Sequence, residues 1–330
     1  MSVYSINCNS YTSTKGFRKS DATLVAFTKV TANTAKTSSD LFIEVNNQAI
    51  YLPANTAITI PASPTIGSDY AIWATPTGTL EATTDFTSPP ATNSRKIGGF
   101  HYAPGGNATG TSGGSTTPGI NEYSFWDLKF RPVCKDPRGM SLIADNFWCD
   151  IYLTGVDAIT NGSSKYNVEI ADGSSPPKIP VMFGGTGSST YGSYTWFQAQ
   201  ELAMYFGKRS MTQQEFMAAM YGTTEENSNG TDPVSTSLIA KYTSKWGIIQ
   251  STGCLYIWGR ERGGPYAAAS WNANTEGRGS EYNGPNASLF GGYWDLSSYS
   301  GSRCSGWDFA ASVSGGVIGS RFACDHLILD

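Results

Sequence analysis

Short runs of β-branched and aromatic residues, separated by turn residues, fill the first third of the chain. Leu41–Val45 is rich in such residues, Asn46 and Asn47 then give a turn signal, and another apolar run follows at 49–52. Runs of this kind predict strands. Further strands are predicted at 23–27, 56–60, 70–74 and 79–82. Strands at this spacing, with turns between them, predict a small all-β sandwich over residues 1–103.

The composition changes at Pro104. Residues 104–120 consist almost entirely of Gly, Ser, Thr, Asn, Ala and Pro. Such a composition predicts a flexible linker or a long loop. We therefore place a domain boundary there, with a second domain over residues 121–330.

The second domain mixes long loops with two short helices. A helix is predicted from Trp196 to Lys208, with Gly207 as its C-cap. Thr212 and Glu215 form a capping box that opens another helix. This helix would place Phe216, Ala219 and Met220 on one face. Apolar runs at 245–249 and 254–259 are strand candidates, so the fold class predicted for the whole chain is α+β.

Charge and composition exclude several classes of function. Charged residues make up 15% of the chain, against about 25% in ordinary soluble domains. The net charge is −4 without a basic stripe, so nucleic-acid binding has no electrostatic basis. No apolar run approaches the ~20 residues of a membrane span. The N-terminus lacks the charged start and apolar stretch of a secretory signal, so we expect another vehicle, such as a virion, if the protein acts outside a cell.

Cysteine and histidine offer little for catalysis. The six cysteines form no Cys-x-x-Cys pair, so no zinc site is expected. Cys134 and Cys149 could form a disulfide, although buried free thiols are the favoured interpretation. His101 and His326 are the two histidines, which leaves an acid–base pair little to draw on. An enzyme would have to rely on cysteines such as Cys254 and Cys324, and we expect no enzyme.

The last forty residues are the most informative segment. Gly, Trp and Arg recur where a fold would need them, and the residues between them follow no pattern, which is typical of a display scaffold. The segment at 253–259, Gly291–Gly292 with Tyr293 and Trp294, and the closing Ile318 to Arg321 resemble the C-type lectin fold of the formylglycine-generating-enzyme subclass. The capping-box helix resembles the second helix of that family.

Within that subclass, the chain resembles phage receptor-binding proteins that a diversity-generating retroelement diversifies. The resemblance runs from about Lys19 to Asp330 and includes the long strings at 95–105, 126–132, 136–140 and 324–329. It implies a variable region at about 255–330, a homotrimer, and a place at the tip of a virion tail fibre. It also implies an additional N-terminal β-domain, which we expect to be missing here.

The resemblance further implies which residues vary and contact the ligand. In the family, adenine mutagenesis changes the first two bases of Asn-type codons. Such changes cannot give Lys, Glu, Gln, Met or Trp, and none of these occurs at the positions onto which the family's variable codons map. Those positions are Tyr293, Asp295, Ser297, Tyr299, Gly306, Asp308, Phe309, Val313, Gly315, Val317, Ile318 and Phe322.

Two interpretations of these positions stay open. As an exposed cluster, the aromatic and aliphatic side chains would form a protein-binding patch, with Asp295, Asp308 and Ser297 at its rim. Alternatively, Val313, Val317, Ile318 and Phe322 are core residues of alternating strands. A scaffold role is predicted for Trp294, Arg303, Trp307 and Arg321, since the five donors of Arg can satisfy several carbonyls in a loop-rich fold.

A sugar-binding calcium site is not expected. Lectins of that kind place carboxylate and amide ligands on either side of a Pro, and Gly284 before Pro285 has no side chain to offer. No cofactor is expected, although a structural calcium ion held by Asp, Asn and carbonyl oxygens is possible.

The leading hypothesis is a viral protein that determines host tropism. It would bind a host surface receptor, most plausibly a protein, together with other tail-fibre proteins. The alternative is a cell-encoded, retroelement-diversified adhesin. Neither the host nor its receptor can be read from the sequence.

Overall fold

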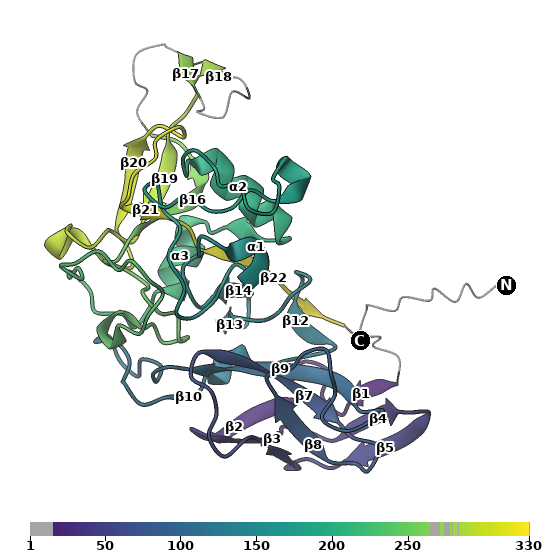
Figure 1. Cartoon of the computed structure of the whole chain (residues 1–330). Coiled ribbons are helices and arrows are strands. Elements are labelled where there is room, and N and C mark those ends of the chain that lie inside the picture. Colours follow the sequence, from purple (N-terminus) through teal and green to yellow (C-terminus); the bar gives the residue numbers. More distant parts are fainter. Residues whose placement is uncertain (1–15, 265–270, 274–277, 279, 283, 330) are drawn as a thin grey trace.

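The chain folds into two mostly β parts, shown one below the other in Figure 1. The computed structural model describes residues 16–264, 271–273, 278, 280–282 and 284–329. The strands of the first part are β1 (Phe17–Lys19), β2 (Phe27–Thr31), β3 (Thr34–Thr37), β4 (Leu41–Val45), β5 (Gln48–Leu52), β6 (Ala57–Thr59), β7 (Ser68–Ala74), β8 (Leu80–Thr83), β9 (Arg95–Ala103), β10 (Gly119–Ile120) and β11 (Trp126–Asp127).

Two sheets of the first part enclose one apolar core. The smaller has the order β1-β4-β5, and the larger has the order β10-β9-β7-β8-β6-β3-β2, with β11 also paired to β9. Phe17 and Ile43 from the smaller sheet share this core with Ile72 and Phe100 from the larger one. The sheet of the first part therefore continues to Asp127, past residue 103, where the composition had suggested a boundary.

The hairpin of β4 and β5 follows directly from its sequence. Leu41, Ile43 and Val45 are buried while the residues between them are exposed, as period-two alternation requires. Asn46 and Asn47 have φ values of 50° and 62°. Two left-handed residues make the tight turn whose twist matches antiparallel strands, and Asn tolerates that conformation.

The Gly/Ser/Thr-rich segment 104–120 is a long loop that lies against the second part. Backbone amides of Ala108, Gly113 and Gly114 donate to the carbonyls of Ser244, Gly222 and Ala240, at 3.1, 2.9 and 2.8 Å. A Cβ on Gly113 would lie 2.4 Å from the backbone of Lys241. The glycines therefore permit close backbone approach, and the flexible linker is wrong while the long loop is correct.

The second part contains all the α-helices of the described residues. Its strands are β12 (Phe130–Pro132), β13 (Met140–Ile143), β14 (Phe147–Asp150), β15 (Arg209–Ser210), β16 (Tyr256–Arg262), β17 (Trp271–Ala273), β18 (Ser280–Tyr282), β19 (Ala287–Phe290), β20 (Ser305–Phe309), β21 (Ile318–Gly319) and β22 (Phe322–Ile328). Its helices are α1 (Ala158–Asn161), α2 (Trp196–Tyr205) and α3 (Gln213–Ala219), and its short 3₁₀ helices are η2 (Val181–Phe183), η3 (Ala240–Tyr242) and η4 (Ser297–Tyr299). The 3₁₀ helix η1 (Glu122–Ser124) lies between β10 and β11 of the first part. None of the helices within the described ranges has the length and apolarity to cross a membrane.

Three sheets organise this part. The first has the order β12-β22-β14-β13, with β15 added to β22. The second has the order β20-β19-β16-β21, and β17 pairs with β18 in a separate hairpin. Figure 1 shows that hairpin projecting beyond the second sheet.

Both predicted helices begin at a capping box. In α3, the Thr212 side chain accepts from the Glu215 amide, and the Glu215 carboxylate accepts from the Thr212 amide. The box that opens α2, formed by Thr195 and Gln198, was not predicted. Gly207 follows α2 with φ +68°, as a C-terminal glycine should.

The predicted strand at 245–249 is wrong. Gly247 has φ +77°, which breaks an extended run. The Trp246 carbonyl accepts instead from the side chains of Asn121 and Ser141. Ile248 and Ile249 are fully buried. The run is therefore apolar because the loop packs into the core, and not because it forms a strand.

His326 on β22 gives the fold a pH dependence. Its Nδ1 accepts from the Trp148 indole N–H at 2.9 Å, so the ring is neutral. Burial lowers the pKa of His326 below its usual value. Because the unfolded chain takes up a proton that the folded chain resists, this contribution to stability is lost as pH falls below about 6.5.

We expect His326→Asn, which keeps an acceptor but does not titrate, to weaken this pH dependence. Urea unfolding of both proteins at pH 8 and pH 5 measures it. The wild type should lose more unfolding free energy between the two pH values than the variant. Equal losses would contradict the assignment.

Candidate binding site

Predicted variable positions gather around one sheet. β19 pairs with β20, which places Leu289 opposite Gly306, and β16 runs parallel to β21, which places Tyr256 opposite Ile318. The predicted positions lie on β20 and β21, in the loops on either side of β20, and at the start of β22. Figure 1 shows these yellow segments together, away from the first part.

Three aromatic rings form a half-buried cluster on this sheet. The Tyr256 ring lies 5.5 Å from that of Tyr293 and 6.2 Å from that of Phe309. Tyr293 and Phe309 were predicted, whereas Tyr256 on β16 was missed. Burial, with smaller effects from Cys304, Tyr293 and Asp308, raises the pKa of Tyr256. Tyr256 is followed by three consecutive buried residues of β16, so no alternation along the sequence could have identified it.

The loop between β19 and β20 presents the most exposed side chains. Tyr299 is 79% exposed, and Asp295, Ser297 and, on β20, Asp308 are also exposed. The loop backbone is nevertheless anchored. Ser302 donates from its amide and its hydroxyl to Glu225 at 2.7 and 2.6 Å, and the Trp294 carbonyl accepts from Gly230 at 2.7 Å.

Gly306 and Gly315 both have room for a side chain. A Cβ on Gly315 would have no heavy atom within 4 Å, and one on Gly306 would meet only ordinary contacts from 3.5 Å. The neighbouring Gly292 and Gly301 differ, because a Cβ on either would lie 2.3 Å from a side-chain oxygen. Val313 and Val317 are partly buried and pack against the core.

Ile318 and Phe322 are core residues, so the prediction that they contact a ligand is wrong. They are 2% and 0% exposed and pack in the same cluster as Trp258. Ile318 lies on β21 inside this cluster, whereas Val317, just before the strand, is only partly buried against it. For Ile318 and Phe322 the core alternative holds.

Arg321 serves the fold. Its guanidinium is fully buried and donates to the carbonyls of Asp150, Ile151, Ile249 and Gln250, at 2.9, 2.6, 2.6 and 3.1 Å. Trp294 and Trp307 are both partly buried, and both pack against the core cluster that contains Phe216 and Phe290. The Trp307 indole donates to Ser305, and its carbonyl accepts from Asn286.

Arg303 does not serve the fold. Its side chain is exposed, and within the described ranges no hydrogen bond, ion pair or ring contact reaches it. The predicted scaffold role is therefore wrong for this residue, because a scaffold arginine has to satisfy carbonyls or carboxylates.

A cationic side chain from β16 lies against the 284–286 loop. Arg262 donates to the Pro285 carbonyl at 2.5 Å and pairs with Glu281. A guanidinium here competes with any calcium ion for the loop's oxygens. Across the described residues, no three acidic, His or Cys side chains cluster as metal ligands.

The cysteines within the described residues are free thiols. Cys134 and Cys149 lie in different core clusters, so the disulfide alternative is wrong and the favoured one is confirmed. Burial raises the pKa of Cys254 to about 12, and a hydrogen bond with Cys134 raises the pKa of Cys324. Neither is therefore poised as a thiolate nucleophile. Cys8 lies outside the described residues.

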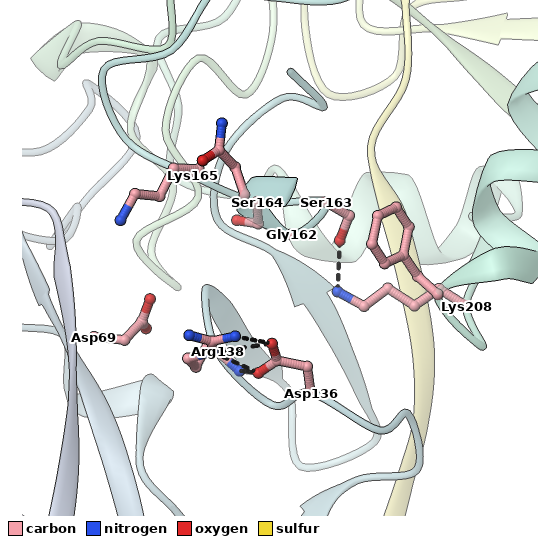
Figure 2. Close-up of a pocket in the computed structure, with 10 residues that line it drawn as sticks. Asp69, Asp136, Arg138, Gly162, Ser163, Ser164, Lys165 and Lys208 are labelled. Atoms are coloured by element: carbon pink, nitrogen blue, oxygen red, sulfur yellow. Dashed lines mark hydrogen bonds and ion pairs between the residues drawn. The ribbon is translucent and has the colours of Figure 1, made fainter. Parts of the chain in front are cut away.

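A small polar pocket lies between the two parts, and Figure 2 shows its charged groups. Asp136 is held by Arg138, and Lys208 donates to Ser163 and to the buried Asp150. Asp69 on β7 accepts from the Gly139 amide at 2.9 Å and from His101, whose other ring nitrogen meets the Tyr152 hydroxyl. These bonds tie β7 and β9 to the second part, so the pocket is a structural junction.

Comparison with known proteins identifies the family. A family model described as Mtd second domain matches residues 25–127. The tail fiber receptor-binding protein of Bordetella phage BPP-1 is 48% identical over 326 residues, which cover 95% of this chain and 85% of that protein. The solved Major Tropism Determinant M1 variant has a TM-score of 0.92 at 48% identity, covering 95% of this chain and 86% of the variant. The U1 variant has a TM-score of 0.93 at 48% identity, covering 96% and 87%. This chain therefore belongs to the family of the Major Tropism Determinants.

Proposed function

We propose that the chain is a receptor-binding protein at the tail fibre of a phage virion, where it determines which host is recognised. The observation that carries this proposal is 48% identity, over 95% of the chain, to a phage tail fiber receptor-binding protein. Its partners are a host surface molecule and the other proteins of the tail fibre. A phage relative of this kind disfavours the cell-encoded adhesin.

The second part is proposed to be a C-type lectin fold that displays loops. The short helices α2 and α3 and the sheet β20-β19-β16-β21 hold the loops on either side of β20. Trp294 and Trp307 anchor this region to the core, while Arg321 joins the end of β14 to the 249–250 loop. Together with the sandwich, this makes the chain an α+β protein of two domains.

We propose that these loops are diversified while the framework is kept. The room at Gly306 and Gly315 supports this, because other side chains could be placed there without moving the backbone. At Gly292 a side chain would collide with Ser300, and at Gly301 it would displace the Glu225 carboxylate. Ten of the predicted positions remain proposed contacts, after removal of Ile318 and Phe322.

The chemistry of the face suits a protein receptor. Tyr293, Tyr299 and Phe309 supply large, rigid contact area at low entropic cost. Asp295 and Asp308 add polar contacts around them. Such a face binds without a catalytic step or a cofactor, so we propose that the protein is not an enzyme.

We also propose that the fold needs no structural calcium ion. Removal of calcium by EDTA is then expected to leave host binding unchanged.

A homotrimer is proposed, because three copies of a weakly binding face on one particle bind a cell surface with much higher avidity than one copy. Light scattering on the purified protein at micromolar concentration is expected to give three times the mass of the chain. A monomer at that concentration would refute this assembly.

Deep sequencing of the gene and its flanking DNA in the source phage population tests the function. We expect variation confined to the predicted codons, beside a near-copy of the 3′ end and a reverse transcriptase gene. A uniform gene without a template copy would leave a receptor-binding protein of fixed specificity. Labelled protein that fails to bind the bacteria infected by the phage would refute receptor binding itself.

A further inference from the structure

A groove beside the predicted variable loop is lined mostly by residues outside the predicted variable set, with Tyr299 as the exception. It consists of two adjoining hollows of about 430 and 550 Å³ that share Tyr221, Ser302 and Arg303. The first hollow is completed by Met217 and Ala218 of α3 and by Trp246. The second contains Tyr299, the most exposed predicted contact.

The first hollow combines apolar walls with one charged group. Phe216 and Ala219 are buried on the core side of α3. Met217 and Ala218 line the groove. The Trp246 indole N–H donates to the Ala218 carbonyl at 2.8 Å. Trp246 can therefore contact a ligand only through the apolar surface of its ring. Arg303 is the charged residue of this hollow.

Arg303 makes no hydrogen bond or ion pair with any described residue. The carboxylates of Glu225 and Glu226 line the second hollow beside it, but Glu225 bonds to Ser302 and neither acid pairs with the guanidinium. The ammonium of Lys245 lies 4.8 Å from the centre of the Trp246 ring, which adds a second positive charge.

An exposed guanidinium beside apolar walls is the arrangement that binds a carboxylate attached to an apolar group. We propose that this groove is a fixed subsite for an acidic side chain of the protein receptor, with Arg303 binding the carboxylate and Met217, Tyr221 and Trp246 packing on the adjoining apolar group. The inference rests on the proposed receptor-binding function. It gives the face one constant contact while neighbouring positions such as Tyr299 vary.

A small probe tests the subsite without the receptor. We would titrate the full-length protein with 3-phenylpropionate and with its neutral counterpart 3-phenylpropanamide, and follow binding by saturation-transfer NMR. The acid is expected to bind and the amide to bind at least about tenfold more weakly, because a charged hydrogen bond is lost. Equal binding of the two compounds, or binding of neither, would overturn the proposal.

Two variants locate the effect. Arg303→Ala is expected to weaken binding of the acid by about tenfold without changing thermal stability, since Arg303 makes no contact in the fold. Arg18→Ala removes an equally exposed arginine of the first part and should leave binding unchanged. If Arg303→Ala binds the acid as well as wild type, the subsite is refuted. Host-cell binding that survives this result would show that the receptor-binding function stands without it.

Discussion

Replacing Arg321 by Met is expected to lower the free energy of unfolding by about 4 kcal/mol or more. The guanidinium is fully buried and bonds four backbone carbonyls. Met fills a similar volume but donates nothing, so these acceptors would lose their charged partner inside the core. Two of the carbonyls end β14 and two belong to the 249–250 loop, so the change also separates these segments.

Denaturant unfolding monitored by tryptophan fluorescence measures the effect. Arg321→Lys should also destabilise, because a single ammonium cannot reach two separate pairs of carbonyls as a planar guanidinium does. Arg18→Met, at an exposed position, is the matched control and should change stability by less than about 0.5 kcal/mol. A loss below about 1 kcal/mol for Arg321→Met would mean that water replaces the guanidinium and that Arg321 is not the support of this region.

Local patterns predicted several regular elements, although the strand predicted at 23–27 is wrong and β2 begins only at Phe27. The β-rich run at 41–45 gave β4 at its observed bounds, and Asn46 with Asn47 gave its turn. The capping box at Thr212 gave the start of α3. In each case the deciding interactions lie within a few residues of one another, so the sequence of that segment is sufficient.

Long-range contacts decided where local patterns misled. Residues 104–120 have the composition of a flexible linker, but amides from this loop bond to carbonyls more than a hundred residues away. Ile248 and Ile249 read as a strand, yet the loop around Trp246 is fixed by Asn121 and Ser141. No property of those segments alone records such partners.

The predicted site residues differ in how deeply they are buried. The landmarks of the resemblance selected Tyr293, Tyr299 and Phe309, which lie at or near the surface around one sheet. Burial of Ile318 depends on its packing with Trp258 and Phe322 in one core cluster, which a linear pattern does not reveal. Arg303 and Arg321 look alike in sequence, and only their surroundings separate the exposed one from the buried one.

Removing the Tyr299 ring is expected to weaken host binding more than any other single change on the face. Tyr299→Ala deletes a side chain that is 79% exposed at the tip of an anchored loop. An aromatic anchor of this kind contributes about 2 kcal/mol or more when it fills a receptor pocket, which is roughly thirtyfold in affinity for one site. Several linked copies in the proposed trimer would enlarge the loss in whole-cell binding.

Labelled wild-type protein and variants, added to the bacteria that the phage infects, measure this loss directly. Tyr299→Phe keeps the ring and should retain most of the binding. Phe322→Leu changes a predicted variable residue that lies in the core, so it should reduce stability and leave the binding of the folded protein unchanged. If Phe322→Leu abolished binding while Tyr299→Ala did not, the receptor would engage the face through a different set of side chains. Because Tyr299 borders the groove of Arg303, the double variant with Arg303→Ala is expected to lose less than the product of the two single effects, as contacts with one receptor segment are not independent.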